Sequence, residues 1–319
     1  QAPHATTPAY SGTFIPTLWS AKLNVKFYAA TTFGDVSNTN WQGEISGMGD
    51  KVIINNIPTI SINAYTVGQS LTYEVPTPNT IELQIDQGRY FGVNVADVLE
   101  YQAKPQLMSM FTDDASQQMK IAVDRDCWAA TFNQAAAANM GATAGVLSGA
   151  YNLGTDTAPV TLTASNILST ITAMAAVLDE QNIPETDRWL VLTPYERQVL
   201  MQSNLAQAQF MGDSQSILRN GKIGQIDRFT VYVSNLLPTG GTGVGWSDGY
   251  GAASTTVVSN AVKRHCMVAG HKSALSFASQ ITKVENLRNP SDFGELVRGL
   301  NVYGRKVTKS SGLALAIVN

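Results

Sequence analysis

The chain has 319 residues, of which 44% are hydrophobic and only 14% are charged, so it can bury a substantial core in one large domain or two ordinary ones. The formal net charge is −3 and the longest basic run is Lys263-Arg264, which argues against a protein that grips nucleic acid over a large basic face. No apolar stretch approaches membrane-spanning length, so we expect no membrane partner.

The low charge predicts a largely uncharged surface, because Gly, Ala, Ser, Thr, Asn and Gln are abundant where an average protein carries about 25% charged residues. Such a surface suits a protein that becomes covered by copies of itself. The cysteines Cys127 and Cys266 lie far apart in apolar settings without a CxxC spacing, which predicts buried reduced thiols.

Residues 1–40 mix Pro, Thr and Ser with scattered aromatic residues and show no sustained period. We interpret them as an extended arm that packs on something, because a disordered tail would be depleted in apolar residues. The alternative is an N-terminal strand and short helix that pack on their own domain.

Residues 41–95 favour β-structure. In "ISINAYTVGQSLTYEV", residues 60–75, apolar side chains recur at every second position on both sides of residues 67–70, which predicts two strands joined by a tight turn. An isolated two-stranded ribbon is marginal in water. The sequence therefore raises the question of what this ribbon lies against.

The period then changes to that of a helix over residues 97–138, with Pro105 in a position to occupy the first turn. A helix of about thirty residues would be roughly 45 Å long. Such a length predicts a spine that runs along an elongated part of the molecule.

A Gly-rich connector, residues 141–159, precedes a second amphipathic helix with Thr163 or Ser165 as its cap. "RWLVLTP" predicts a buried strand followed by a helix that starts at Pro194, and "KIGQIDRFTVYV" predicts further strands. We expect the Gly-rich stretch 239–254 to be a mobile loop.

The remaining segments predict strands around one short helix. "HCMVAG" is typical of a buried strand, "HKSALSFAS" of a short helix, and "QITKVENL", "VRGLNVYGRKV" and "GLALAIV" of strands. Since strands and helices do not alternate regularly, the order of elements favours an α+β fold over a doubly wound sheet.

The sequence offers no convincing enzyme site. It lacks a phosphate-binding G-x-x-x-x-G-K-[ST] motif, and its three histidines do not have a zinc spacing. His265 and His271 flank Cys266, but the thiol lies in an expected buried strand. Asp113-Asp114 and residues 124–126 favour a solvated or subunit-facing side of the spine helix. We therefore predict no catalytic, cofactor-binding or metal-binding residues.

The ordered combination of arm, projecting ribbon, spine helix and mixed block, with "RWLVLTPYERQVL", "GKIGQIDRFTVYVSNLLP" and "AGHKSALSFASQITKVENLRNPSDFGELVRGLNVYGRKV", resembles the major capsid proteins of tailed double-stranded DNA bacteriophages. The resemblance covers nearly the whole chain and implies the HK97-like fold. The implied segments are an N-arm (1–40), an E-loop excursion (41–92), a P-domain with the spine helix (93–160), an A-domain (161–279), return strands of the P-domain (280–308) and a C-terminal strand (309–319).

The resemblance also implies a function without catalysis: self-assembly into an icosahedral shell of hexamers and pentamers that encloses packaged double-stranded DNA, in a virion put together in the host bacterial cytoplasm. Scaffolding and portal proteins are implied partners, a decoration protein is a further candidate, and contact with DNA would be nonspecific. Since the chain has no Lys between Lys51 and Lys104, we expect no E-loop cross-link of the kind the namesake phage makes.

By the same resemblance, the E-loop would lie across the P-domain of a neighbouring subunit, and the N-arm would also contact other copies. The implied E-loop contacts are Ile60, Ile62, Tyr65, Leu71, Tyr73 and Val75, and the implied N-arm contacts are Phe14, Ile15, Leu18 and Trp19.

Two alternatives stay open at this point. One is an encapsulin-type compartment shell, which uses the same fold to enclose cargo enzymes. The other, from a different class, is a cytoplasmic hydrolase centred on Asp113, Asp124 or Cys266.

Overall fold

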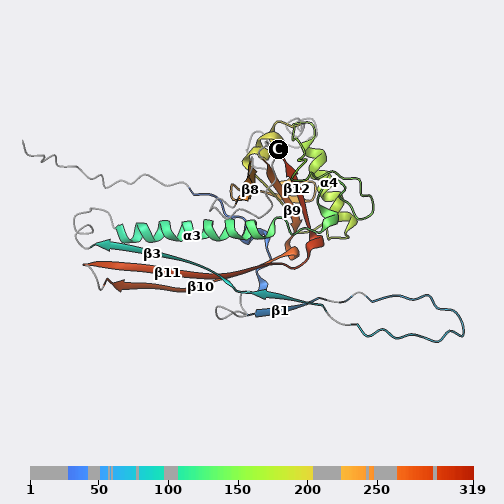
Figure 1. Ribbon diagram of the computed structural model, residues 1–319, viewed down its shortest axis with the longest axis horizontal. Helices are drawn as coiled ribbons and strands as arrows, with labels where there is room; N and C mark the ends of the chain where they lie inside the picture. The colour runs from blue at the N-terminus through green and yellow to red at the C-terminus, as the bar shows by residue number, and fades with distance from the viewer. Residues whose placement is uncertain are drawn as a thin grey trace, which may run out of the picture.

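The structure is a computed structural model, and its described residues are 28–41, 51–56, 58, 60–76, 79–96, 107–203, 224–241, 244–247, 264–289 and 293–319. An elongated sheet with a helix along it runs into a compact domain at one end, and a thin loop projects beyond that end (Figure 1).

The elongated sheet has three antiparallel strands in the order β10-β11-β3, and the long helix α3 lies along it (Figure 1). Helix α3 is about 38 Å long at 1.5 Å per residue. The predicted spine is present, but it ends at Thr131, whereas the sequence predicts helix as far as residue 138. The position predicted for its first turn, Pro105, is outside the described residues. The bounds are β3 Gln87–Ala96, α3 Leu107–Thr131, β10 Leu275–Arg288 and β11 Gly294–Val307.

The compact domain is built on a five-stranded sheet in the order β12-β9-β4-β6-β5, in which β4 and β6 are parallel and the other pairs are antiparallel. Its central strand β4 is buried along its whole length, because both faces of the sheet are covered. The bounds are β4 Arg188–Leu192, β5 Gln225–Ile226, β6 Phe229–Val233, β9 His265–His271 and β12 Leu313–Val318.

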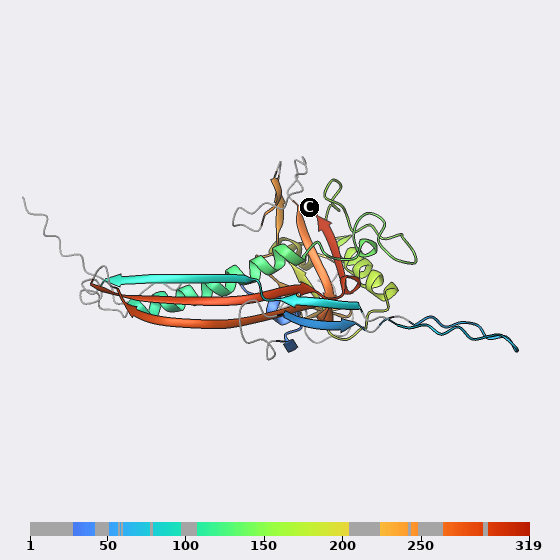
Figure 2. The same cartoon turned by 60° about the horizontal axis from the view of Figure 1, so that its bottom comes forward.

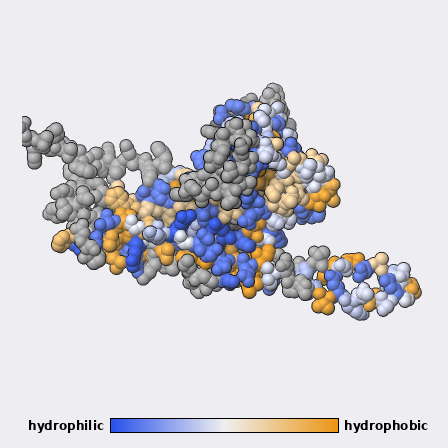
Figure 3. Space-filling view, viewed as in Figure 1, coloured by the Kyte–Doolittle hydropathy of each residue, from blue (hydrophilic) through white to orange (hydrophobic). Residues whose placement is uncertain are grey.

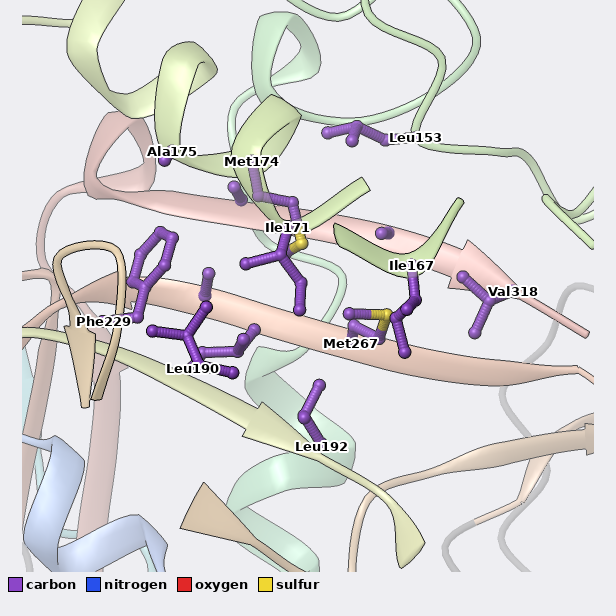
Figure 4. Close-up of a cluster of buried hydrophobic side chains, with 14 of the residues drawn as sticks. Leu153, Ile167, Ile171, Met174, Ala175, Leu190, Leu192, Phe229, Met267 and Val318 are labelled. Atoms are coloured by element: carbon purple, nitrogen blue, oxygen red, sulfur yellow. The ribbon is translucent and has the colours of Figure 1, made fainter. Parts of the chain in front are cut away.

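One face of this sheet packs against helix α4, Ile167–Glu180, whose apolar residues follow a helical period. Ile171 and Met174 of α4 meet Leu190 and Phe229 of the sheet in the largest buried cluster (Figure 4). Helix α5, Pro194–Met201, begins with Pro194 as predicted and carries a capping box formed by Thr193 and Glu196.

The other face packs against the C-terminal half of α3 and the short helix α1, Phe33–Val36. The Trp128 ring stands edge-on to Phe33 (5.1 Å between ring centroids) and to Trp189 (5.9 Å). Because β4 alternates, Trp189 and Val191 join this cluster while Leu190 and Leu192 join the cluster under α4.

A third cluster lies where the antiparallel pair β1, Lys51–Asn56, and β2, Asn79–Gln84, covers part of the elongated sheet. Val52 and Leu83 pack there against Ala278 and Val302. This pair is the root from which the projecting loop, residues 60–76, leaves the molecule (Figure 2).

The β12 edge of the five-stranded sheet is covered by the chain that leads into α4. Ile317 N donates to Leu153 O (2.8 Å) and its carbonyl accepts from Val160 N (2.9 Å). Gly154 is required at this crossing, since a Cβ there would lie 2.2 Å from the Ile317 carbonyl oxygen.

Three further sequence predictions about local structure, all outside the projecting loop, are wrong. Asn166, not Thr163 or Ser165, precedes helix α4, and its Oδ1 accepts from Thr163 N (2.7 Å). The short helix predicted over 271–279 is one 3-10 turn, Lys272–Ala274, followed at once by β10. In the Gly-rich stretch expected to be a mobile loop, the described residues form an antiparallel strand pair, β7, Thr239–Gly241, and β8, Val244–Ser247, while residues 248–254 of the prediction lie outside the described part of the chain.

Candidate functional site

The projecting loop, residues 60–76, consists of two extended segments joined by a turn, and it reaches away from the rest of the molecule (Figures 1 and 2). Gln69 N donates to Thr66 O (3.1 Å), and Gly68 has φ +88°, so the turn is where the sequence predicts it. The segments are not paired as β-strands, which corrects the predicted hairpin. Ser61 N instead donates across to the Glu74 carboxylate (3.1 Å).

All the predicted contact residues of the loop are exposed. Ile62 is 92% exposed and Tyr73 is 87% exposed, and the space-filling view shows apolar side chains spread along the loop (Figure 3). Val67 at the tip of the turn is also exposed, and the sequence does not predict it as a contact because it lies in the turn, outside the alternation. Exposed apolar side chains gathered in one place are typical of interaction surfaces. The exposed set is Ile60, Ile62, Tyr65, Val67, Leu71, Tyr73 and Val75.

The N-arm residues predicted to contact other copies, Phe14, Ile15, Leu18 and Trp19, lie outside the described residues. The part of the N-terminal region that is described begins at Tyr28 and is fixed to α3 of its own chain. Its anchor is Phe33, which packs edge-on against Trp128 and Phe277.

Asp124 of α3 holds this anchor and is buried, which corrects the expectation of a solvated or subunit-facing side chain. Its Oδ1 accepts from Phe33 N (2.7 Å) and Thr32 N (3.0 Å), whereas its Oδ2 is buried without a hydrogen-bond partner. Burial raises the pKa of the carboxyl to about 6, although both backbone donors act in the opposite direction.

Asp126, two residues further along α3, ties the helix to the elongated sheet. Its Oδ2 accepts from Tyr303 Oη (2.6 Å) and pairs with Arg305 (2.9 Å), while Arg89 Nη2 lies 3.6 Å from Oδ1. Burial and the hydrogen bond to Asp126 raise the pKa of Tyr303. Asp124 and Asp126 thus have separate structural partners and do not form a pair of catalytic carboxylates.

The remaining candidates for chemistry are also structural. Cys266 is buried, its Sγ donates to Pro238 O (3.3 Å), and burial raises the pKa of the thiol well above its usual value. His265 stacks on Tyr195 (5.4 Å between centroids), and His271 Nδ1 accepts from Ser273 N (3.1 Å). The prediction that both cysteines are buried and reduced is confirmed.

The middle of the elongated sheet carries a second exposed apolar surface, which the sequence does not predict. Tyr90 and Leu300 are direct cross-strand partners and both are exposed. Together with Phe91, Gly299 and the ion pair of Glu285 and Arg298 they line a shallow depression of about 360 Å³. The alternating pattern along β3 and β11 predicts which side chains share a face of the sheet. It does not predict which of the two faces is exposed, so this surface cannot be identified from the sequence.

None of the helices in the described part of the chain is long and apolar enough to cross a membrane. Among the same residues, no cluster of three or more His, Cys, Asp or Glu side chains is arranged to bind a metal ion.

Solved structures with the same architecture include phage capsids. A protein of Mycobacterium phage Che8 matches with a TM-score of 0.70 at 24% identity over 98% of both chains. The capsid of cyanophage P-SCSP1u matches at 0.67 and 16% identity over 96% of this chain and 93% of the other. The mature capsid of bacteriophage PhiM1 matches at 0.67 and 15% identity over 99% and 97%. The fold is therefore HK97-like, as the sequence predicts.

A family model described as phage capsid protein matches residues 78–314. The chain thus belongs to the phage capsid protein family. Its family and its structural neighbours are structural proteins rather than enzymes, which overturns the alternative of a cytoplasmic hydrolase. A comparison with curated protein sequences gave no match.

Proposed function

We propose that the chain is the major capsid subunit of a tailed phage, and that copies of it assemble into hexamers and pentamers of an icosahedral shell around packaged double-stranded DNA. Assembly takes place in the cytoplasm of the host bacterium with scaffolding and portal proteins as partners. Membership of the phage capsid family and the HK97-like fold support this proposal.

The observation that carries the proposal is the uncovered apolar row on the projecting loop. Its side chains gain almost nothing from their own chain, since Ile62, Tyr65, Val67 and Tyr73 are all mainly exposed. Burying them on a second copy would contribute roughly 25 cal/mol per Å² before the cost of association. We propose that the loop is the E-loop and that it lies across the elongated sheet and spine helix of a neighbouring copy.

The segment boundaries follow the same proposal. Residues 1–40 are the N-arm, 41–92 the E-loop excursion, 93–160 and 280–308 the P-domain, 161–279 the A-domain and 309–319 the C-terminal strand. At three points the sheets cross these boundaries: β3 begins at Gln87, β10 begins at Leu275, and β12 pairs with β9 inside the five-stranded sheet.

The proposed relation to DNA is enclosure rather than specific binding. With a formal net charge of −3, a subunit does not hold the packaged DNA irreversibly, and its contacts with DNA are nonspecific. A decoration protein on the outer surface is compatible with this arrangement.

Negative-stain electron microscopy of the purified chain tests the proposal. We expect spherical shells or capsomers, and shells from infected cells that absorb at 260 nm because they contain DNA. A monomer that persists at high concentration in the presence of scaffold would contradict the proposal. Shells that contain enzymes instead of nucleic acid would point to an encapsulin-type compartment.

A charge in the loop tests the contact itself. Ile62→Asp and Tyr73→Asp are expected to abolish shell formation while leaving the melting temperature of the subunit unchanged, because neither side chain is buried in its own chain. Ile62→Val is the matched control and should assemble. Equal loss of soluble subunit in the Asp variants would show that the loop packs on its own chain. Deletion of residues 1–20 tests the N-arm in the same way.

A further inference from the structure

The connector between α3 and α4 forms a tight, well-anchored turn that the proposed function does not explain. Ala144 and Tyr151 exchange backbone hydrogen bonds (Ala144 N to Tyr151 O, 2.7 Å; Tyr151 N to Ala144 O, 3.0 Å), which closes a tip of residues 145–150. Gly145 N also donates to Ala138 O (2.7 Å). We call residues 145–150 the Gly145 tip.

A carboxylate from α4 fixes the conformation of the Gly145 tip. Glu180, the last residue of α4, accepts from Leu147 N (2.8 Å) and Ser148 N (3.2 Å) through one oxygen. The hydrogen bonds from Ser148 and Leu147 lower the pKa of Glu180, so the side chain is ionised and attracts both N–H dipoles at neutral pH. Gly145 is needed here, because it has φ +111° and a Cβ would lie 2.9 Å from Glu180 Oε2.

The fixed tip presents two apolar side chains to solvent. Leu147 is 82% exposed and Val146 is about half exposed. Exposed apolar residues on a mobile loop would be unremarkable, but here backbone hydrogen bonds and a dedicated carboxylate hold them outward. A contact group that is already ordered loses little conformational entropy on binding, and this is how preorganised interfaces gain affinity.

The small size of the tip and its place in the molecule indicate what kind of partner it contacts. Two side chains are far too small to form a stable interface alone, which takes about 800 Å² from each partner, so the tip needs a partner that is held by other contacts as well. Helix α4 lies at the end of the molecule from which loop 60–76 projects (Figures 1 and 2). A copy engaged by the loop is therefore on the same side as the tip.

We propose that the Gly145 tip is a second intersubunit contact, in which Val146 and Leu147 pack against the compact domain of a neighbouring copy of this chain. This inference rests on the proposed function. The loop then sets the contact made by the elongated part of the molecule, and the tip sets the contact made by the compact domain.

A thiol placed at the tip tests the inference directly. Both native cysteines are buried, so Leu147→Cys provides the reactive thiol among the described residues. We expect its reaction with a small maleimide to slow at least tenfold when a small amount of this variant is assembled with excess unmodified chain. An unchanged rate of maleimide reaction in assembled shells overturns the inference, since the tip would then be exposed to solvent or would bind a different protein.

A second pair of variants separates a contact from a folding effect. Leu147→Ser should raise the critical concentration for assembly about tenfold or more, since one buried leucine contributes roughly that factor, and Leu147→Met should restore it. The melting temperature of the subunit should not change in either variant. Assembly of Leu147→Ser at the wild-type concentration contradicts the inference alone, whereas failure of the unmodified chain to assemble contradicts the proposed function as well.

Discussion

Leu71 in the projecting loop and Leu190 in β4 have the same side chain in opposite surroundings, one 58% exposed and the other fully buried. Both lie in short segments rich in apolar residues. Strand β4 has a hydrogen-bonded neighbour on each side, with α4 over one face and α1 and α3 over the other. The loop has none of these layers. The comparison teaches that an apolar pattern predicts burial without saying which chain provides the cover.

The largest effect on subunit stability is expected in the buried half of this comparison. Leu190→Ala leaves a cavity between β4 and α4 and should lower the free energy of unfolding by about 4 kcal/mol. Urea denaturation of the unassembled subunit measures this. A loss below about 1 kcal/mol would mean that the cluster under α4 repacks or is looser than its burial indicates.

A smaller effect is expected where the N-terminal region meets α3. Asp124 has a pKa of about 6 in the folded chain and an ordinary value near 4 when unfolded. The folded state therefore binds the proton more tightly, so this group is stabilising below about pH 4 and its contribution is lost as the pH rises through about 6. The negative charge of Asp35 also raises the pKa of Asp124. Lys120 is the charged residue that lines a small pocket together with Asp124.

The variant Asp124→Asn should remove this pH dependence. Relative to wild type, its unfolding free energy should rise by about 2 to 3 kcal/mol between pH 4 and pH 7. Urea denaturation of both proteins across that range, with Asp113→Asn as a control at an exposed position on the same helix, measures the difference. Parallel pH profiles would show that Asp124 is not protonated near pH 6 in the folded subunit.

The smallest effect belongs to the exposed half of the comparison. Leu71→Ala makes the same chemical change as Leu190→Ala but should alter the unfolding free energy of the subunit by less than about 0.5 kcal/mol. Its cost should appear instead as weaker assembly, measured by light scattering. A stability loss close to that of Leu190→Ala would remove the distinction between the two regions.

The sequence predicts best the elements whose cause is local. Strand β4 is a continuous apolar run, and α5 begins with Thr193, Pro194 and Glu196, which together specify a capped helix start. The alternating apolar side chains of the projecting loop are exposed, but the two segments form no backbone ladder. Their contact with a neighbouring copy, which the resemblance implies, stays a prediction.

Elements whose cause lies far away in the chain were predicted poorly. Residues 275–279 look helical in isolation, yet each pairs with a residue of β11 beginning at Leu275 with Val307. In the sequence, Asp124 and Asp126 look solvated because their partners are far away along the chain. Asp124 binds Thr32 and Phe33. Asp126 binds Tyr303 and Arg305. Propensity and period describe local preference, and tertiary contacts override them.

The segment around Leu153 and Val160, which covers the edge of β12, has a consequence for synthesis of the subunit in a cell. An open strand edge is a template on which any extended chain can add, and high concentrations of one protein make such addition frequent. Leu153 and Val160 occupy the hydrogen-bonding groups of Ile317 from within the same chain, so nascent copies crowded together cannot fuse along this border. At this edge, subunits therefore recognise one another through side-chain contacts rather than through backbone hydrogen bonds. Side-chain contacts discriminate better between a correct and a wrong partner.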